Sequence, residues 1–193
     1  MTEQEVLNRE LAVMQAMAAH IEGYLASDVT RWDMGVAGMP PMTIGGILMR
    51  RRRLDALDAR LTPEQRRIRD ETNQQFDEAL VEKVVRFEQR AQDELHARLR
   101  EWTNYLRDLP SRSAAKPETY AFVADTRVVI GVLIDKLREP PYQLAPRISR
   151  DLAAVDRRLQ SIWNGGPFIW DAIWEPAYPG DDYWYLYGGP REG

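Results

Sequence analysis

One apolar helical stripe constrains the fold of this chain more than any other feature of its sequence. It runs from Pro63 to Leu109 with no Gly or Pro between these two residues. Its start is marked by "TPEQ", in which Thr62 and Gln65 have the spacing of a capping box and Pro63 suits the first helical turn. A helix of this length would measure roughly 70 Å at about 1.5 Å per residue, so it needs several partner helices or a second chain to cover it.

Four further stripes with helical spacing predict four more helices. We expect them at residues 3–27, 47–60, 118–138 and 146–163, the last ending at Gly165 and Gly166 as C-cap residues. The Gly- and Pro-rich stretch at 28–46 carries many apolar residues, so we interpret it as an ordered loop, and 110–117 as a short loop. The fold class predicted is all-α: an elongated up-and-down bundle of about five helices, one of them very long, with an aromatic C-terminal tail packed on it.

We divide the chain into a helical bundle at residues 1–163 and a tail at 164–193 that is a strap and not an independent domain. The tail holds nearly half of the aromatic residues. Its segment "GPFIWDAIWEP" predicts a two-turn helix capped by Gly166, and "DYWYLYGG" predicts an extended segment. Two interpretations compete: the rings pack against the bundle of the same or a second chain, which we favour, or they form an exposed surface that binds a partner. The candidate partner-binding residues are Trp170, Trp174, Tyr183, Trp184, Tyr185 and Tyr187.

Arginines are concentrated between residues 50 and 69, and guanidinium groups suit phosphates and other anions. Pairing with acids of neighbouring helices is the alternative. The candidate anion-binding residues are Arg50, Arg51, Arg52, Arg53, Arg66, Arg67 and Arg69. The net charge of the chain is −4, and no nucleic-acid-binding motif is present, so we do not expect nucleic acid as a partner.

Residues that commonly carry catalysis or bind metals are scarce. The chain has no Cys and only two His, and Asp93 with His96 makes only half of a di-iron motif. Thr43, Gly45 and Gly46 precede a predicted helix whose N-terminus could hold an anion, but their spacing matches no phosphate-binding motif. We therefore predict no catalytic residue, no metal ligand and no cofactor.

The composition is that of a globular protein, with 44% hydrophobic and 29% charged residues. We find neither a membrane-spanning stretch nor a targeting segment, and we expect a cytoplasmic protein without membrane contact. Our leading hypothesis is a non-enzymatic structural or protein-interaction module that forms a homodimer. An anion or nucleic-acid binder acting through residues 50–69 is the alternative, and a small-molecule or metal site inside the bundle near His96 is a third hypothesis.

Overall fold

The computed structural model describes residues 2–109 and 116–191, and most of the loop predicted at 110–117 lies outside them. The all-α class and the packing of the aromatic tail on the bundle are confirmed. In chain order, the elements are α1 (Glu3–Ala26), α2 (Ile44–Ala56), the 3-10 helix η1 (Asp58–Arg60), α3 (Pro63–Glu82), α4 (Val84–Asp108), α5 (Pro117–Arg138), α6 (Pro146–Gln160), β1 (Trp163–Phe168), the 3-10 helices η2 (Ala172–Ala177) and η3 (Trp184–Leu186), and β2 (Tyr187–Pro190).

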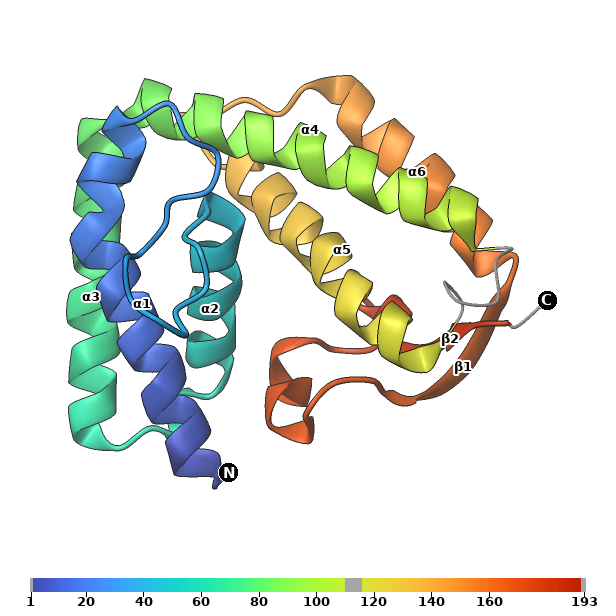
Figure 1. The fold of residues 1–193 in the computed structure, drawn as a ribbon, viewed down its shortest axis with the longest axis horizontal. Coiled ribbons are helices and arrows are strands. Elements are labelled where there is room, and N and C mark those ends of the chain that lie inside the picture. The colour runs from blue at the N-terminus through green and yellow to red at the C-terminus, as the bar shows by residue number, and fades with distance from the viewer. Residues whose placement is uncertain (1, 110–115, 192–193) are drawn as a thin grey trace.

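The helices form two groups joined by α4 (Figure 1). Helices α1, α2 and α3 lie side by side in the first group, while α4 crosses above them and runs along α5 and α6. The tail returns beneath α5 toward the end of α2, which η2 contacts. One continuous apolar core extends through both groups and into the tail, from Leu7 on α1 through Trp102 on α4 to Tyr185 in η3.

The long stripe forms two helices in place of the single helix that we predicted. The capping box at Thr62 and Gln65 is present, but α3 ends at Glu82 and α4 begins at Val84. Lys83 between them has φ −125° and ψ 40°. Because of this bend, α3 packs on α1 while α4 packs on α5, and one chain buries a stripe that a straight helix would have left partly uncovered.

Helix α2 begins three residues earlier than predicted, so Gly45 and Gly46 lie in its first turn and not before it. The Thr43 side chain caps the helix by accepting a hydrogen bond from the Gly46 N–H at 3.0 Å. The loop before it is ordered as expected: Trp32 and Met42 form a β-bridge, and Met34 and Met42 are buried.

The start of the tail also differs from our prediction. Helix α6 ends at Gln160, and Gly165 and Gly166 belong to β1, which pairs antiparallel with β2. The two-turn helix expected after Gly166 is absent from the described residues: β1 runs to Phe168, and the 3-10 helix η2 follows with Asp171 as its cap. The second strand requires Gly188, which has φ +127° and approaches β1 so closely that a Cβ would lie 2.0 Å from the Asn164 carbonyl oxygen.

Within residues 2–109 and 116–191, no helix combines the length and the apolar character needed to cross a membrane.

Candidate functional site

The two features that stand out in the sequence, the Arg cluster and the aromatic tail, pack against each other. Arg53 projects from α2 among the tail rings, with its guanidinium carbon 5.3 Å from the ring centre of Trp170 and 5.0 Å from that of Trp174. Its Nε–H donates to the Tyr178 hydroxyl at 2.8 Å. Burial raises the pKa of Tyr178 to about 12, although Arg53 acts to lower it. This contact attaches the tail to α2.

Two further arginines hold the tail in the same way. The Nε–H of Arg52 donates to the Ala177 carbonyl at 2.8 Å, and its guanidinium lies 4.7 Å from the ring centre of Tyr183. Arg127 on α5 lies 4.5 Å from the ring centre of Tyr185. It also forms a half-buried ion pair with Asp156 on α6 at 2.8 Å, so it joins α5, α6 and the tail.

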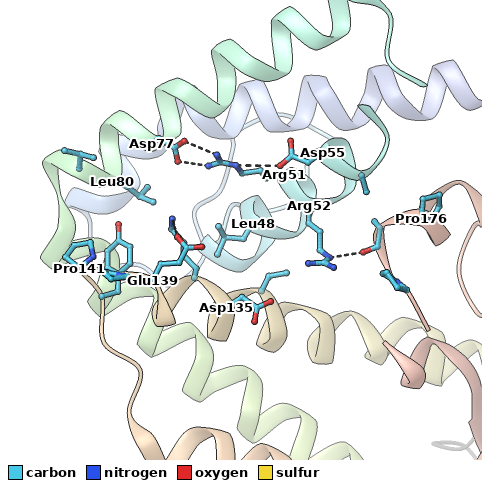
Figure 2. A pocket seen from close by; sticks show the side chains of 18 residues that line it. Leu48, Arg51, Arg52, Asp55, Asp77, Leu80, Asp135, Glu139, Pro141 and Pro176 are labelled. Atoms are coloured by element: carbon cyan, nitrogen blue, oxygen red, sulfur yellow. Dashed lines mark hydrogen bonds and ion pairs between the residues drawn. The ribbon is translucent and has the colours of Figure 1, made fainter. Parts of the chain in front are cut away.

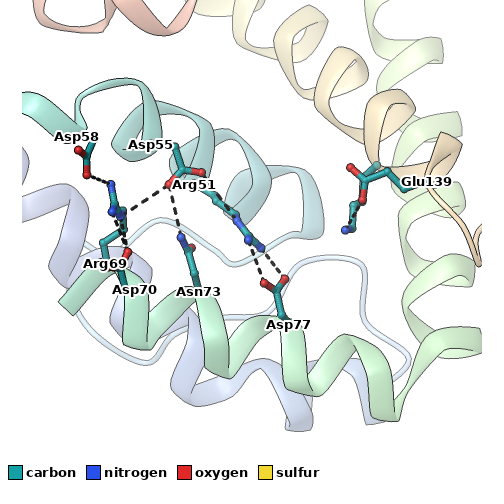
Figure 3. Close-up of polar contacts among 9 residues, drawn as sticks. Arg51, Asp55, Asp58, Arg69, Asp70, Asn73, Asp77 and Glu139 are labelled. Atoms are coloured by element: carbon teal, nitrogen blue, oxygen red, sulfur yellow. Dashed lines mark hydrogen bonds and ion pairs between the residues drawn. The ribbon is translucent and has the colours of Figure 1, made fainter. Parts of the chain in front are cut away.

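Five members of the predicted anion-binding cluster have acidic partners within the first group of helices or in η1. Arg51 makes a bidentate pair with Asp77 on α3, with N–O distances of 2.6 and 2.9 Å (Figure 3). This hydrogen bonding is the main cause that raises the pKa of Arg51. Arg50 pairs with Glu10 on α1, Arg66 with Asp58, Arg67 with Glu64 and Glu71, and Arg69 with Asp58 and Asp70. Together with the tail contacts of Arg52 and Arg53, each of the seven has a partner within the chain.

The structure places the candidate partner-binding aromatics mostly inward. Trp174, Tyr183 and Tyr185 are buried, and Trp170, Trp184 and Tyr187 are half-buried. The Trp170 indole N–H donates to the Ala121 carbonyl of α5 at 2.7 Å, and the Tyr187 hydroxyl donates to the Tyr178 carbonyl at 2.9 Å. These rings pack on the bundle of their own chain, so little of their surface is left for a partner.

A hollow lies beside the Arg cluster, and we call it the central cleft (Figure 2). It has a volume of about 750 Å³ and lies between α2, α3, the C-terminal end of α5 and the tail. Much of its wall is apolar and rich in proline, and includes Leu48, Leu80, Val132, Pro140, Pro141, Pro176 and Pro179. Proline has no backbone N–H, so the proline part of this wall offers a ligand carbonyl acceptors but no backbone donors.

Most charges around the central cleft neutralise one another. Its carboxylates are Asp55, Asp77, Asp135 and Glu139, and its cations are Arg51, Arg52 and Lys136. Arg51 pairs with Asp77 and lies 4.0 Å from Asp55, and Lys136 pairs with Glu139 at 2.7 Å. Asp135, which is exposed on α5, has no hydrogen bond or ion pair among the described residues, and the terminal nitrogens of Arg52 have none either.

Asp135 and Arg52 thus give the central cleft one free carboxylate and one partly free cation. The close-up view shows them on facing elements, Asp135 on α5 and Arg52 on α2 (Figure 2). Both act on the buried Tyr183 hydroxyl: burial raises the pKa of Tyr183, Arg52 lowers it and Asp135 raises it. The sequence did not single out Asp135, because an exposed acid in a helix has no local signal that sets it apart.

The remaining candidate residues from the sequence make contacts within the chain. His96 Nδ1 lies 2.8 Å from the Gln92 carbonyl oxygen within α4. Among residues 2–109 and 116–191, no three His, Asp or Glu side chains gather as a metal site. The N-terminus of α2, which we considered for an anion, is filled by the buried carboxylate of Glu94, whose Oε2 accepts from the Gly45 N–H at 2.9 Å.

Comparison of this chain with models of protein families, with curated proteins and with solved structures gives no match. Indications of function therefore come from the residues of the chain itself, above all those around the central cleft.

Proposed function

We propose that this chain is a non-catalytic protein-interaction module whose central cleft receives a short segment of a partner protein. One observation carries the proposal: the cleft combines an apolar, proline-rich wall with the Asp135 carboxylate, which has no partner among the described residues. Clefts of several hundred Å³ lined by apolar groups with a few polar ones are typical binding sites.

A peptide segment suits the two free polar groups of the cleft. A backbone offers carbonyl oxygens, which the terminal nitrogens of Arg52 can bind, and basic side chains or N–H groups, which Asp135 can bind. The tail carbonyl of Ala177 already accepts a hydrogen bond from Arg52 Nε, so the same guanidinium would link the tail to the incoming segment.

The charge of the site favours a basic and apolar segment. The cleft has four carboxylates against three cations, and the neighbouring outer face of α3 adds Glu78 and Glu82. Val81, which is 77% exposed, lies between these two regions and lines both. An apolar side chain over Val81 and a basic one near Asp135 would meet complementary surface.

A random peptide library displayed on phage and selected on the full chain tests this proposal. We expect the selected peptides to be enriched in basic and apolar residues. The substitution Asp135→Lys should weaken their binding by about tenfold or more, since it places like charges together. The matched control is Asp151→Lys, which reverses an exposed carboxylate on α6 outside the cleft.

Two results would contradict the proposal: a library from which no peptide is enriched, or peptides whose affinity is unchanged by Asp135→Lys. Anion binding through the Arg50–Arg69 cluster has less support, because all seven arginines have partners within the chain. A site near His96 has less support as well, since its Nδ1 already lies within hydrogen-bonding distance of the Gln92 carbonyl oxygen.

A further inference from the structure

The outer face of α6 is a row of exposed arginines. Its inner face buries Ile148, Leu152 and Leu159 against the bundle. At 3.6 residues per turn, the opposite side of the helix carries Arg147, Arg150, Ala154, Arg157 and Arg158. We call Arg147, Arg150, Arg157 and Arg158 the α6 basic face.

These arginines differ from those of the Arg50–Arg69 cluster in making no ion pair within the described part of the chain. All four are exposed, and within the described part of the chain none of their guanidinium groups makes a hydrogen bond or an ion pair. Two acids lie on the same helix: Asp156 is paired with Arg127, and the exposed Asp151 follows Arg150 directly and has no ion pair among the described residues. The α6 basic face therefore presents four arginines against the single carboxylate of Asp151, a net positive charge on a chain whose net charge is −4.

The same chain carries a surface of opposite charge and equal length. The outer face of α3 presents Glu71, Gln75, Glu78 and Glu82, which are exposed and follow one another at helical spacing. Glu71 is paired with Arg67, whereas Glu78 and Glu82 make no ion pair among the described residues. Glu71 to Glu82 and Arg147 to Arg158 are the same number of residues apart, roughly 16 Å of helix at about 1.5 Å per residue. We call these residues of α3 the α3 acidic face.

We propose that the α6 basic face of one copy of this chain binds the α3 acidic face of a second copy. The inference shares Glu78 and Glu82 with the surface beside the central cleft but does not depend on Asp135, so the reversals on α6 test it separately. Helices α3 and α6 belong to the two different helix groups and lie at opposite sides of the molecule (Figure 1). Each copy carries both faces, so two copies can bind through two equivalent contacts, or the contact can continue head to tail from copy to copy.

Light scattering on the full chain at about 50 mM and at about 500 mM salt tests this contact, because the higher concentration screens charges beyond a few Å. At low salt, we expect a mass above the 22.3 kDa of one chain that rises with protein concentration. At high salt the mass should fall to that of one chain.

Charge reversals identify the two faces. Arg157→Glu with Arg158→Glu should give a single-chain mass at low salt, and so should Glu78→Arg with Glu82→Arg. Mixing the two variants should restore the larger mass, because the reversed faces complement each other. The control is Arg9→Glu with Arg100→Glu, two exposed arginines on α1 and α4 that also have no partner among the described residues; it should assemble like the original chain.

The proposal is overturned by a single-chain mass at low salt, by a larger mass that survives either reversal or the higher salt, or by a mixture that fails to restore assembly. Another result would overturn the proposal too: the chain stays a single-chain species and is retained on heparin, and this retention is lost when Arg157 and Arg158 are reversed. The α6 basic face would then bind a polyanion.

Discussion

At the scale of single residues, Gly45 determines how closely α2 approaches its neighbours. A Cβ at this position would lie 2.4 Å from Val129 Cγ1 on α5 and 3.0 Å from Glu94 Oε1 on α4. Gly131 is also helical, but a Cβ there would meet only the end of the Arg127 side chain, at 3.6 Å. There is therefore no room for a side chain at Gly45, whereas there is room at Gly131.

We predict opposite effects for alanine at these two positions. Gly45→Ala should lower the free energy of unfolding by about 1–3 kcal/mol, because α2 must move away from Val129. Gly131→Ala should raise it by about 0.5–1 kcal/mol, because alanine favours the helix and finds space. Urea unfolding measures both, and equal effects of the two substitutions would contradict the steric difference between the sites.

Glu94 gives a prediction on pH. Burial raises the pKa of this carboxyl group above its ordinary 4.5, against the lowering effects of Gly45, Thr43 and Arg98. A raised pKa in the folded state means that the group stabilises the fold fully below the unfolded pKa, and that this contribution is lost as the pH rises through the folded pKa. Glu94→Gln removes this titration. The free energy of unfolding of the variant should therefore rise relative to that of the original chain as the pH increases above about 4.5.

Chemical unfolding across this pH range checks the expectation, and parallel curves for the two chains would refute it. Glu94→Ala serves as the comparison. It removes the acceptor of the buried Gly45 N–H and should cost about 1–3 kcal/mol at every pH.

The sequence could not have indicated these residue-scale contacts. Gly45 and Gly46 are poor helix formers, so they predicted a turn before α2, and only the Thr43 cap together with Glu94 explains why the helix includes them. Glu94 is one of many acids on a polar helix, and its partner Gly45 is 49 positions away in the chain.

At the scale of elements, the attachment of the tail depends on Arg53. Its side chain is 13% exposed and makes the Tyr178 hydrogen bond, the two tryptophan contacts and a 3.5 Å ion pair with Glu10. Arg67 on α3 is 57% exposed and, among the described residues, pairs only with acids of its own helix. The two arginines belong to the same sequence cluster, but only Arg53 holds the tail.

We predict that Arg53→Ala loosens the tail and leaves the helices in place. The loss of a charged hydrogen bond and of the ring contacts should cost about 2–3 kcal/mol, and near-UV circular dichroism of the tryptophans should weaken while the far-UV signal is kept. Arg67→Ala should change neither signal. A tail spectrum unaltered by Arg53→Ala would show that other contacts are sufficient to hold it.

Elements with a strong apolar stripe could be predicted, and those that depend on distant partners could not. The stripes located α1, α5 and most of α6, and "TPEQ" located the start of α3. No Gly or Pro marks the bend at Lys83, which arises because α3 and α4 have different partner helices. The strand β1 was missed because its pairing with β2 joins Trp163 to Pro190, and "NGGP" has no alternating pattern of its own.

At the scale of the whole molecule, the tail and the helices share one core. Four of the six tryptophans, Trp163, Trp170, Trp174 and Trp184, lie in β1 or after it, whereas the far-UV signal comes mainly from α1 to α6. We predict that tryptophan fluorescence and far-UV circular dichroism give the same urea midpoint, because a shared core unfolds as one unit. Two separate midpoints would mean that the tail unfolds on its own.

The contacts of α2 with the tail can form only after the tail has been synthesised, well after α2. Arg52 and Arg53 leave the ribosome 125 residues ahead of Ala177 and Tyr178, to which they are bonded. At about 5–20 residues per second, the delay is roughly 6–25 s. During this delay, the cleft lacks the wall formed by Pro176 and Pro179, and it lacks the Ala177 carbonyl that orients Arg52. If the cleft binds the partner segment that we propose, we expect binding only after residues 176–179 have left the ribosome and packed beside α2.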